Sequence, residues 1–276
     1  MNKENIYEKI YEYCSIPGRP ATKNGFIVPK RVKAIQRMLS QAGISYTLES
    51  FMGRTFNNFF YNIYCTGNSS LCFTAHHDIT GASAGANDNS ASVINLIALK
   101  MNRPDANIVF TDGEEVGGIG AELFAKDIIE GSFPKTKSIL NLELTGLGGK
   151  RFFIEKESNS VIAQLIKSMP QFNYGTGIPI PELLPPFNDA VIFRQQNIDS
   201  VVINPLPPLL PNGQTREPFP KKKVIFSDGT PLDFTIVSRC NGKKDTIDTI
   251  STADMKEFVE EVLIPIFDTW QNTYPI

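Results

Sequence analysis

The sequence predicts a three-layer α/β/α fold, in which helices cover both faces of a mostly parallel mixed sheet. Short apolar runs, typical of strands buried on both faces, alternate along the chain with segments whose apolar residues recur at helical spacing. This alternation is typical of parallel strands joined by helices. With 276 residues, 41% of them hydrophobic, the chain can bury one large core. We therefore expect residues 1–276 to form a single domain, with no separate lid or dimerisation domain.

The first elements are two helices and two β-rich runs. Apolar side chains at helical spacing predict helices at residues 1–15 and 29–42. Two runs rich in β-forming residues follow at residues 57–65 and 71–75. The turn-forming segment 66–69 between them predicts a hairpin or a pair of neighbouring strands.

The rest of the chain continues the alternation. It predicts, in order, a helix at 89–100, a strand at 107–111, a helix at 120–129, a strand at 138–145, helices at 159–169 and 189–196, a strand at 200–204, a strand at 233–237 and a closing helix at 252–270. The Pro-rich segment 205–223, with its Asn212-Gly213 turn pair, predicts a long surface loop. Loops of this length are often functional lips or are disordered, and both interpretations stay open.

Charge and composition exclude two classes of partner. The 27 basic and 29 acidic residues give a formal net charge of -2, which leaves no electrostatic footprint for nucleic acid or anionic lipid. No apolar run approaches the roughly 20 residues of a membrane-spanning helix. We expect a peptide or small amide as the partner. The N-terminal residues do not resemble a signal peptide and the four cysteines form no CxxC pair, so we expect a cytoplasmic protein with reduced thiols.

Candidate metal ligands follow several predicted strands. In an α/β sheet the ligand crevice lies beyond the carboxyl ends of the strands, so polar residues at these points are the first candidates for chemistry. Each of these segments carries carboxylate or imidazole groups: His76-His77-Asp78, Asn87-Asp88-Asn89, Asp112-Gly113-Glu114-Glu115 and Glu143.

The first two segments each offer a ligand and a simpler interpretation. Because side chains alternate across a strand, His76 and Asp78 project to one side and His77 to the other. His76 can bind zinc while Asp78 orients its ring, but a solvated loop is the simpler interpretation. His77 is expected to be structural or solvent-facing. Asp88 can bridge two cations with its two oxygens, or it can simply cap the helix that follows.

The remaining acids pose a problem that a cation would solve. Glu114 and Glu115 are adjacent and repel one another unless a cation or a shared proton relieves them. One of them would then be a ligand and the other a general base; an exposed acidic loop is the alternative. Glu143 lies in an apolar run, where a charge is costly unless it is ligated or belongs to an ion pair.

Taken together, these motifs resemble those of the zinc aminopeptidases with two co-catalytic metals, a family that includes the glutaminyl cyclases. The family's motifs H-x-D, G-A-x-D-N, E-E-x-G and an acid after an N-L pair correspond here to His76-His77-Asp78, Gly85-Ala86-Asn87-Asp88-Asn89, Glu114-Glu115-Val116-Gly117 and Asn141-Leu142-Glu143. The resemblance extends from about residue 57 to the end of the chain.

Carried over residue by residue, the resemblance implies a role for each of these groups. His76 and Glu143 would hold one zinc ion, Asp88 would bridge both ions, and Glu115 would belong to the second. Glu114 would be the general base and Asp78 the acid that orients the site. The segment from Asp189 to Val202 resembles the helix and strand that precede the family's last ligand.

The match breaks at that last ligand. The family places a histidine four residues before the first Asp of a D-T-I-like run, and the corresponding position here, before Asp245, is Asn241. The only histidines are His76 and His77. Cys240 can offer a thiolate in its place, Asn241 can bind weakly through its amide oxygen, or the second site takes water or a harder metal. An inert thiol is the alternative for Cys240.

The resemblance implies a metal-dependent exopeptidase that removes N-terminal residues from peptides, with one or two zinc ions. An aminopeptidase is preferred to a carboxypeptidase, because elements of the main sheet take up the chain between Glu143 and Asn241 and leave no room for a lid domain. The missing histidine favours a catalytically inactive or mononuclear relative that acts as a binding protein. A glutaminyl-cyclase-like acyltransferase is a weaker alternative, because the resemblance implies that its single-metal chemistry also relies on this histidine.

Overall fold

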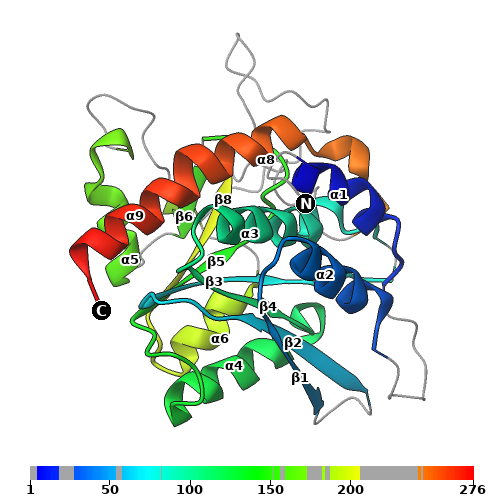
Figure 1. The fold of residues 1–276 in the computed structure, drawn as a ribbon, viewed down its shortest axis with the longest axis horizontal. Helices are drawn as coiled ribbons and strands as arrows, with labels where there is room; N and C mark the ends of the chain where they lie inside the picture. Colours follow the sequence, from blue (N-terminus) through cyan, green and yellow to red (C-terminus); the bar gives the residue numbers. More distant parts are fainter. Residues whose placement is uncertain are drawn as a thin grey trace.

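The computed structural model describes residues 5–18, 28–53, 58–81, 83–150, 152–155, 159–172, 182–183, 187–205, 242–243 and 245–276. Within them, eight strands form one mixed sheet in the order β1-β2-β4-β3-β5-β8-β6-β7 (Figure 1). The strands are β1 Thr47–Met52, β2 Phe59–Cys65, β3 Leu71–His76, β4 Asn107–Thr111, β5 Ser138–Leu142, β6 Phe152–Glu155, β7 Glu182–Leu183 and β8 Ser200–Pro205.

The four central strands β4, β3, β5 and β8 run parallel. Antiparallel pairings join β1 to β2, β2 to β4 and β6 to β8, while the short β6–β7 pairing is parallel. The parallel strands are buried along their whole length, which agrees with the mostly apolar runs in their sequences. Their carboxyl ends therefore lie at one edge of the sheet.

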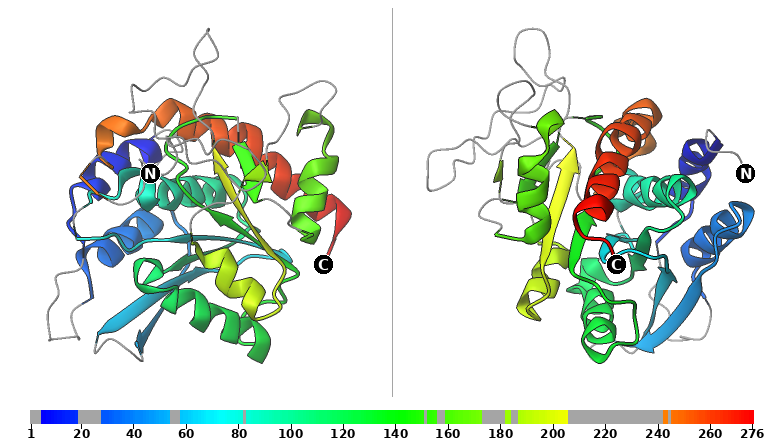
Figure 2. Two further views of the ribbon diagram at one scale, coloured as in Figure 1. Left: turned by 180° about the vertical axis from the view of Figure 1, so that it is seen from behind. Right: turned by 60° about the vertical axis from the view of Figure 1, so that its left-hand side comes forward.

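Helices cover both faces of this sheet (Figure 2). On one face, α3 (Ala91–Asn102) packs with α1 (Asn5–Cys14) and with α8 (Thr252–Phe258) and α9 (Ile264–Thr273), in a core that also includes residues of α2 (Lys30–Gln41) and α5 (Val161–Ser168). On the other face lie α4 (Ile119–Glu130) and α6 (Asp189–Gln195), whose Phe124 and Phe193 meet edge to face. The predicted three-layer α/β fold is confirmed.

Alternation along β3 shows how one strand serves both layers. Phe73 and Ala75 belong to the core under α3 and α9, and Phe73 contacts the ring of Phe267. Cys72, which lies between Leu71 and Phe73, belongs to the core under α4 and α6. Thr74 and His76 share the second side by the same alternation, so a polar stripe runs up this side of β3 to its carboxyl end.

The prediction that residues 57–65 and 71–75 form a hairpin or neighbouring strands is wrong. β4 lies between β2 and β3: Phe110 of β4 pairs with Ile63 on one side and with Ala75 on the other. The segment 66–69 does turn the chain, but β4, which comes later in the sequence than both strands, lies between them. Local turn chemistry carries no information about such an insertion.

The closing helix is interrupted at its centre. The predicted helix at 252–270 is divided into α8, a π-helical turn over Val259–Leu263, and α9. Pro265 stands at the start of α9. It has no N–H for the helical ladder and its ring crowds the preceding turn, so a wider turn at this point relieves the conflict.

Three strands, β1, β6 and β7, were not predicted. β1 is an edge strand whose residues are either exposed or half-buried. Its sequence mixes polar and apolar residues and shows no apolar run. The predicted strand at 233–237 lies outside the described residues, as does the Pro-rich segment beyond Pro205. All described strands belong to one sheet, and the single-domain organisation of residues 1–276 stays a prediction.

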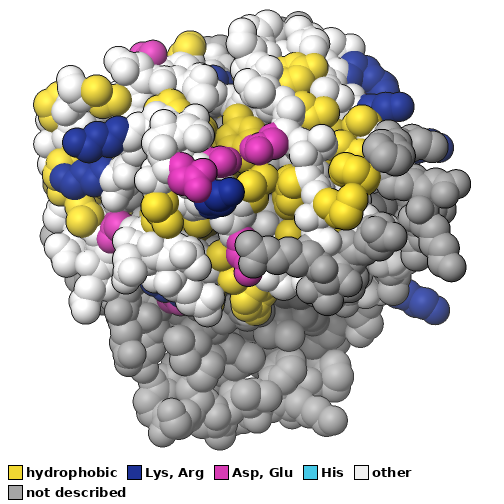
Figure 3. All heavy atoms as spheres, turned by 90° about the horizontal axis from the view of Figure 1, so that it is seen from below, with side chains coloured by type: hydrophobic (Ala, Val, Ile, Leu, Met, Phe, Trp, Pro, Cys, Tyr) yellow, Lys and Arg dark blue, Asp and Glu magenta, His cyan; other side chains and the backbone are white. Residues whose placement is uncertain are grey.

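In the described part of the chain, no helix is long and apolar enough to cross a membrane. The face of the molecule in Figure 3 carries acidic and basic side chains interspersed with hydrophobic and neutral ones. Charges of both signs therefore share this described surface.

Candidate metal centre

The site lies at the carboxyl ends of the central parallel strands, as the topology predicts. His76 is the last residue of β3 and pairs with Thr111, the last residue of β4. Glu143 directly follows β5. Asp88 comes from the turn Ala86–Ser90 that opens α3, and Glu114 from the short helical turn Glu114–Val116 after β4.

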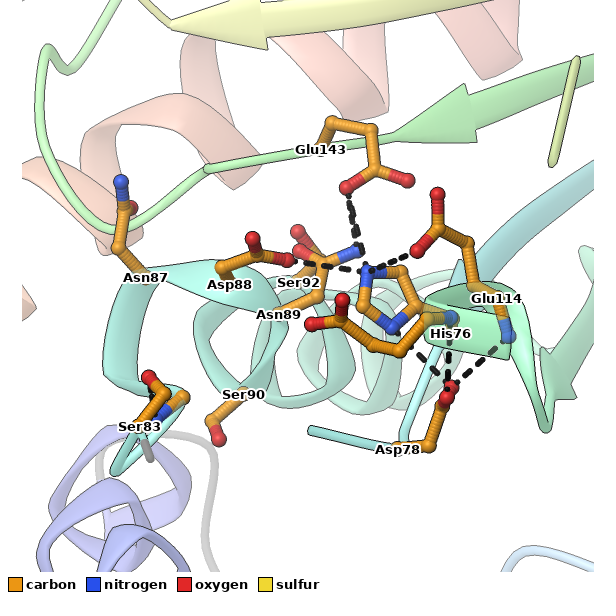
Figure 4. Close-up of polar contacts among 12 residues, drawn as sticks. His76, Asp78, Ser83, Asn87, Asp88, Asn89, Ser90, Ser92, Glu114 and Glu143 are labelled. Atoms are coloured by element: carbon orange, nitrogen blue, oxygen red, sulfur yellow. Dashed lines mark hydrogen bonds and ion pairs between the residues drawn. The ribbon is translucent and has the colours of Figure 1, made fainter. Parts of the chain in front are cut away.

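The imidazole of His76 stands at the centre of a ring of carboxylates (Figure 4). Its Nε2 atom lies 3.1 Å from Asp88 Oδ1, 3.5 Å from Glu143 Oε2 and 4.0 Å from Glu114 Oε2. Its Nδ1 atom lies 3.3 Å from Asp78 Oδ1. Ligand atoms of His76, Asp88 and Glu143 all lie within 4.8 Å of one another. One imidazole nitrogen therefore faces the carboxylates of Asp88, Glu143 and Glu114, and the other faces Asp78.

Asp88 is held by a carboxylate from a distant part of the chain. Asp245 is buried and accepts the backbone N–H groups of Asn87 at 2.7 Å and of Asp88 at 3.1 Å. Gly85 begins this turn at φ +60°, where an added Cβ would lie 2.1 Å from Ile79 Cγ2. The helix α3 begins after Ser90, and no side-chain cap by Asp88 is present there. The helix-cap interpretation of Asp88 is therefore wrong, because its side chain turns to His76 instead.

Glu143 is fixed by two amides. Asn141 donates to Glu143 Oε1 at 3.1 Å and Asn89 donates to Oε2 at 3.0 Å. Asn141 in turn accepts from the hydroxyl of Thr74 at 2.8 Å. These bonds hold both carboxylate oxygens without a cation from Lys or Arg among them, and the second oxygen stays directed at His76. The group is preorganised for a positive partner on the His76 side.

Asp78 ties the imidazole to the acidic turn. It accepts the backbone N–H of Glu114 at 3.2 Å and that of Glu115 at 3.1 Å. The turn is possible because Gly113, Gly117 and Gly118 flank it with positive φ. Asp78 thus contacts both His76 and the backbone that carries Glu114, and its orienting role stays a prediction.

The electrostatics of the cluster favour a cation. Burial alone would lower the pKa of His76, but the carboxylates of Glu143 and Glu114 outweigh it and raise the pKa well above its usual value. Burial raises the pKa of Glu114 to about 10, with further increases from Glu143, Asp189 and Asp78. Without a metal, therefore, the acids must hold protons or share the imidazolium charge. A divalent cation would relieve this conflict, so the imidazole and carboxylate donors fit a zinc ion.

The other expected site residues have mixed outcomes. Glu115 lies beside Glu114 but is not one of the three residues whose ligand atoms converge. Cys240 and Asn241 lie outside the described residues. His77 is buried, with Nε2 2.8 Å from the carbonyl oxygen of Tyr61, so its structural interpretation is right and its solvent-facing one is wrong. The solvated-loop alternative for residues 76–78 is wrong, since His76 is 1% exposed.

Asp189 is a further acid near the site, and from the sequence it was expected only as the first residue of the helix before the family's last ligand. It is fully buried in the first turn of α6, and its Oδ2 accepts the hydroxyl hydrogen of Thr111. Its Oδ1 has no hydrogen-bond partner among the described residues. Burial raises its pKa to about 7, and His76 lowers it. The only local sequence signal is an asparagine at the N-cap followed by Asp189. Ordinary helix starts share this pattern, so it does not identify a site residue.

The buried acid predicts a pH dependence of the metal-free protein. A folded-state pKa of about 7, above the 3.8 of an ordinary aspartate, means that the native state holds this proton between about pH 4 and pH 7 while the unfolded state does not. The free energy of unfolding should therefore fall as the pH rises through this window, by about 2–4 kcal/mol from this group. Asp189→Asn should flatten that fall, as measured by urea denaturation of chelator-treated protein between pH 4 and pH 8. Equal slopes for both proteins would contradict it.

Fold and site together define an α/β protein with a candidate metal centre at the carboxyl edge of its sheet. The sequence model of peptidase family M28 matches residues 63–263. The chain belongs to this family, and the expected resemblance is confirmed. A vacuolar membrane protease of Vanderwaltozyma polyspora is 30% identical over 116 residues, which make up 40% of this chain and 12% of that protein. The chain thus matches only a small part of that relative.

Several solved structures share the fold of this chain at low sequence identity. A Zn-dependent exopeptidase from Parabacteroides distasonis aligns over 97% of this chain and 98% of its own, with a TM-score of 0.67 and 16% identity. The glutaminyl cyclase of Porphyromonas gingivalis aligns over 97% of this chain and 98% of its own, with a TM-score of 0.66 and 14% identity. An aminopeptidase from Aneurinibacillus sp. strain AM-1 aligns over 98% of this chain and 92% of its own, with a TM-score of 0.67 and 11% identity.

Proposed function

We propose that this chain is a metal-dependent aminopeptidase that hydrolyses N-terminal residues from peptides or small amides. The observation that carries the proposal is the convergence of ligand atoms of His76, Asp88 and Glu143 within 4.8 Å, with a third acid, the partly buried Glu114, 4.0 Å from the imidazole Nε2. Membership of the peptidase family and the fold of the aminopeptidase neighbour support it.

Three residues would hold the metal. The Nε2 atom of His76 and oxygens of Asp88 and Glu143 form a nitrogen and oxygen donor set that suits zinc. A zinc ion bound there supplies Lewis-acid polarisation of a carbonyl oxygen and of water. Asp78 orients the imidazole from its other nitrogen, and Asp245 holds the backbone at Asp88.

Glu114 would be the general base. A neighbouring cation lowers the pKa of a carboxyl, so Glu114 would be ionised when the site is loaded and could take the proton of the attacking water. The same carboxyl would then give that proton to the leaving amine. Asp78 accepts the N–H of Glu114, which fixes the turn that presents this side chain.

A second zinc site would lack one of its usual ligands, because Asn241 stands where the family has a histidine. Asp88 would bridge the two ions and Glu115 would bind the second, with Cys240 or Asn241 in place of the missing histidine. The zinc content per chain separates the two forms. Two ions mean that one of these groups completes the pair, and one ion means a mononuclear centre.

The test is hydrolysis of aminoacyl p-nitroanilides by the full chain after equilibration with zinc. We expect turnover of substrates with a free α-amine, its loss with 1,10-phenanthroline and its return with added zinc. The matched N-acetylated substrates should remain intact, since an aminopeptidase requires the free N-terminus. Equal hydrolysis of both sets would refute the aminopeptidase assignment. No turnover by zinc-loaded protein over a broad substrate panel would favour a binding protein.

A glutaminyl-cyclase-like acyltransferase is the second candidate. The fold of the cyclase from P. gingivalis supports it, since the alignment covers nearly the whole of both chains. An N-terminal glutaminyl peptide distinguishes the two activities, because the cyclase releases ammonia and leaves a pyroglutamyl peptide, whereas the aminopeptidase releases free glutamine.

A further inference from the structure

One arginine from the N-terminal helices reaches the backbone of the metal centre. Arg31, in the first turn of α2, is 3% exposed. Its Nε atom donates to the carbonyl oxygen of His77 at 3.0 Å, and its Nη2 donates to Ser90 Oγ at 2.7 Å. Its Nη1 lies 3.4 Å from the carbonyl oxygen of Tyr13 and 3.5 Å from that of Ile16. None of these partners is a carboxylate.

This burial of a cation needs a reason. A guanidinium is strongly disfavoured in a dry interior unless its donors are satisfied, and carbonyl and hydroxyl oxygens compensate less than an ion pair does. Part of the compensation comes from α1, because carbonyl groups at a helix C-terminus favour a cation. The ring of Tyr13 adds a cation–π contact at 4.0 Å. These contacts explain how α1 and α2 are joined. They do not explain the bonds from Arg31 to the carbonyl oxygen of His77 and to Ser90 Oγ.

Those two bonds reach the two segments that carry the proposed ligands. His77 stands between His76, whose imidazole is the centre of the cluster, and Asp78, which orients it. Ser90 ends the turn that presents Asp88. One planar guanidinium therefore fixes the distance between the segment of His76 and the segment of Asp88. Its fork of N–H groups has the fixed geometry that this task requires, which a lysine ammonium lacks.

We propose that Arg31 is a positioning residue of the metal centre, so that the helices α1 and α2 are part of the support of the site. Both helices lie outside residues 63–263, which the family's sequence model matches. The inference rests on the proposed metal centre at His76, Asp88 and Glu143. Beyond that proposed centre, the inference states that zinc affinity depends on Arg31, a side chain that touches neither zinc nor substrate.

The test compares zinc affinity in Arg31→Gln and Arg31→Lys with that of the wild type, by competition with a chromophoric chelator. Loss of groups that orient metal ligands weakens metal binding by about 10–100-fold, and we expect Arg31→Gln in this range. Arg31→Lys should be intermediate, since one nitrogen cannot reach both segments. The visible spectrum of the cobalt-substituted protein should change in Arg31→Gln, because the ligand geometry changes.

Two controls separate positioning from general loosening. Arg37→Gln removes an exposed arginine of the same helix, whose partner is Glu12 of α1, and should leave zinc affinity unchanged. Ile10→Ala opens the core beneath α1 and should lower Tm while the zinc Kd stays within about twofold of the wild type. A weakening of zinc binding by Ile10→Ala as large as that by Arg31→Gln would overturn the inference.

Each outcome separates the inference from the proposed function on which it rests. If the wild type binds no zinc, the proposed metal centre fails and the inference fails with it. If the wild type binds zinc and Arg31→Gln binds it equally well, only the inference fails. If Arg31→Gln does not fold, Ser90→Ala takes its place, because it removes the contact at Nη2 while Arg31 keeps its bond to the carbonyl oxygen of His77. Weaker zinc binding and an altered cobalt spectrum would then support the inference, and unchanged values would overturn it.

Discussion

Replacement of Glu114 by glutamine is expected to lower kcat for aminoacyl anilide hydrolysis by about 10²–10⁴-fold, the usual contribution of general acid–base catalysis. Glutamine keeps the shape of the side chain and cannot accept the proton of water. Zinc content should stay at the wild-type level, because Glu114 is not one of the three residues whose ligand atoms converge. KM should change little, since the lost interaction belongs to the transition state. Steady-state kinetics and elemental analysis of the same preparations measure both quantities.

The matched control is Glu122→Gln, an exposed glutamate in the first turn of α4. It removes one negative charge a short distance along the chain and should leave kcat unchanged. Wild-type kcat in Glu114→Gln would mean that the base is another group, and Glu115→Gln would be the next variant. Loss of zinc in Glu114→Gln would instead make Glu114 a ligand.

The central sheet was predictable from the sequence because its strands are buried on both faces. The runs at β3, β4, β5 and β8 are short and mostly apolar, and their pattern needs no information from the rest of the chain. β1 shows no such run, because it lies at the edge and exposes part of its length. The position of β4 between β2 and β3 depends on pairing across the sheet, which no local pattern encodes.

The groups that support the site were less predictable than the candidate ligands. His76, Asp78, Asp88, Glu114 and Glu143 stand in short motifs, and the structure brings them around one imidazole. By contrast, the carboxylate of Asp245 holds Asn87 from 158 residues away, and Asp189 meets Thr111 across 78 residues. The meaning of such residues comes from the fold that brings them to the site, so their types alone did not identify them.

His76→Ala is expected to abolish tight zinc binding, because it removes the nitrogen ligand and the group around which Asp88 and Glu143 are arranged. For the wild type, zinc at 100 times its Kd should raise the free energy of unfolding by about 2.7 kcal/mol, which corresponds to roughly 5–10 °C in Tm for a chain of this size. In His76→Ala this zinc-dependent rise should vanish. Differential scanning fluorimetry with and without zinc, together with elemental analysis, measures the effect.

The neighbouring histidine provides the control. His77→Gln alters a buried side chain of the same type on the opposite side of the chain, where Nε2 contacts the carbonyl oxygen of Tyr61. It should lower the free energy of unfolding by about 1 kcal/mol, for one hydrogen bond, equally with and without zinc. The zinc-dependent rise in Tm should be kept. If both variants lost that rise, zinc binding would depend on the stability of this segment rather than on the imidazole of His76. If neither lost it, the metal would bind elsewhere, and the carboxylates around His76 would have to be neutralised by protons.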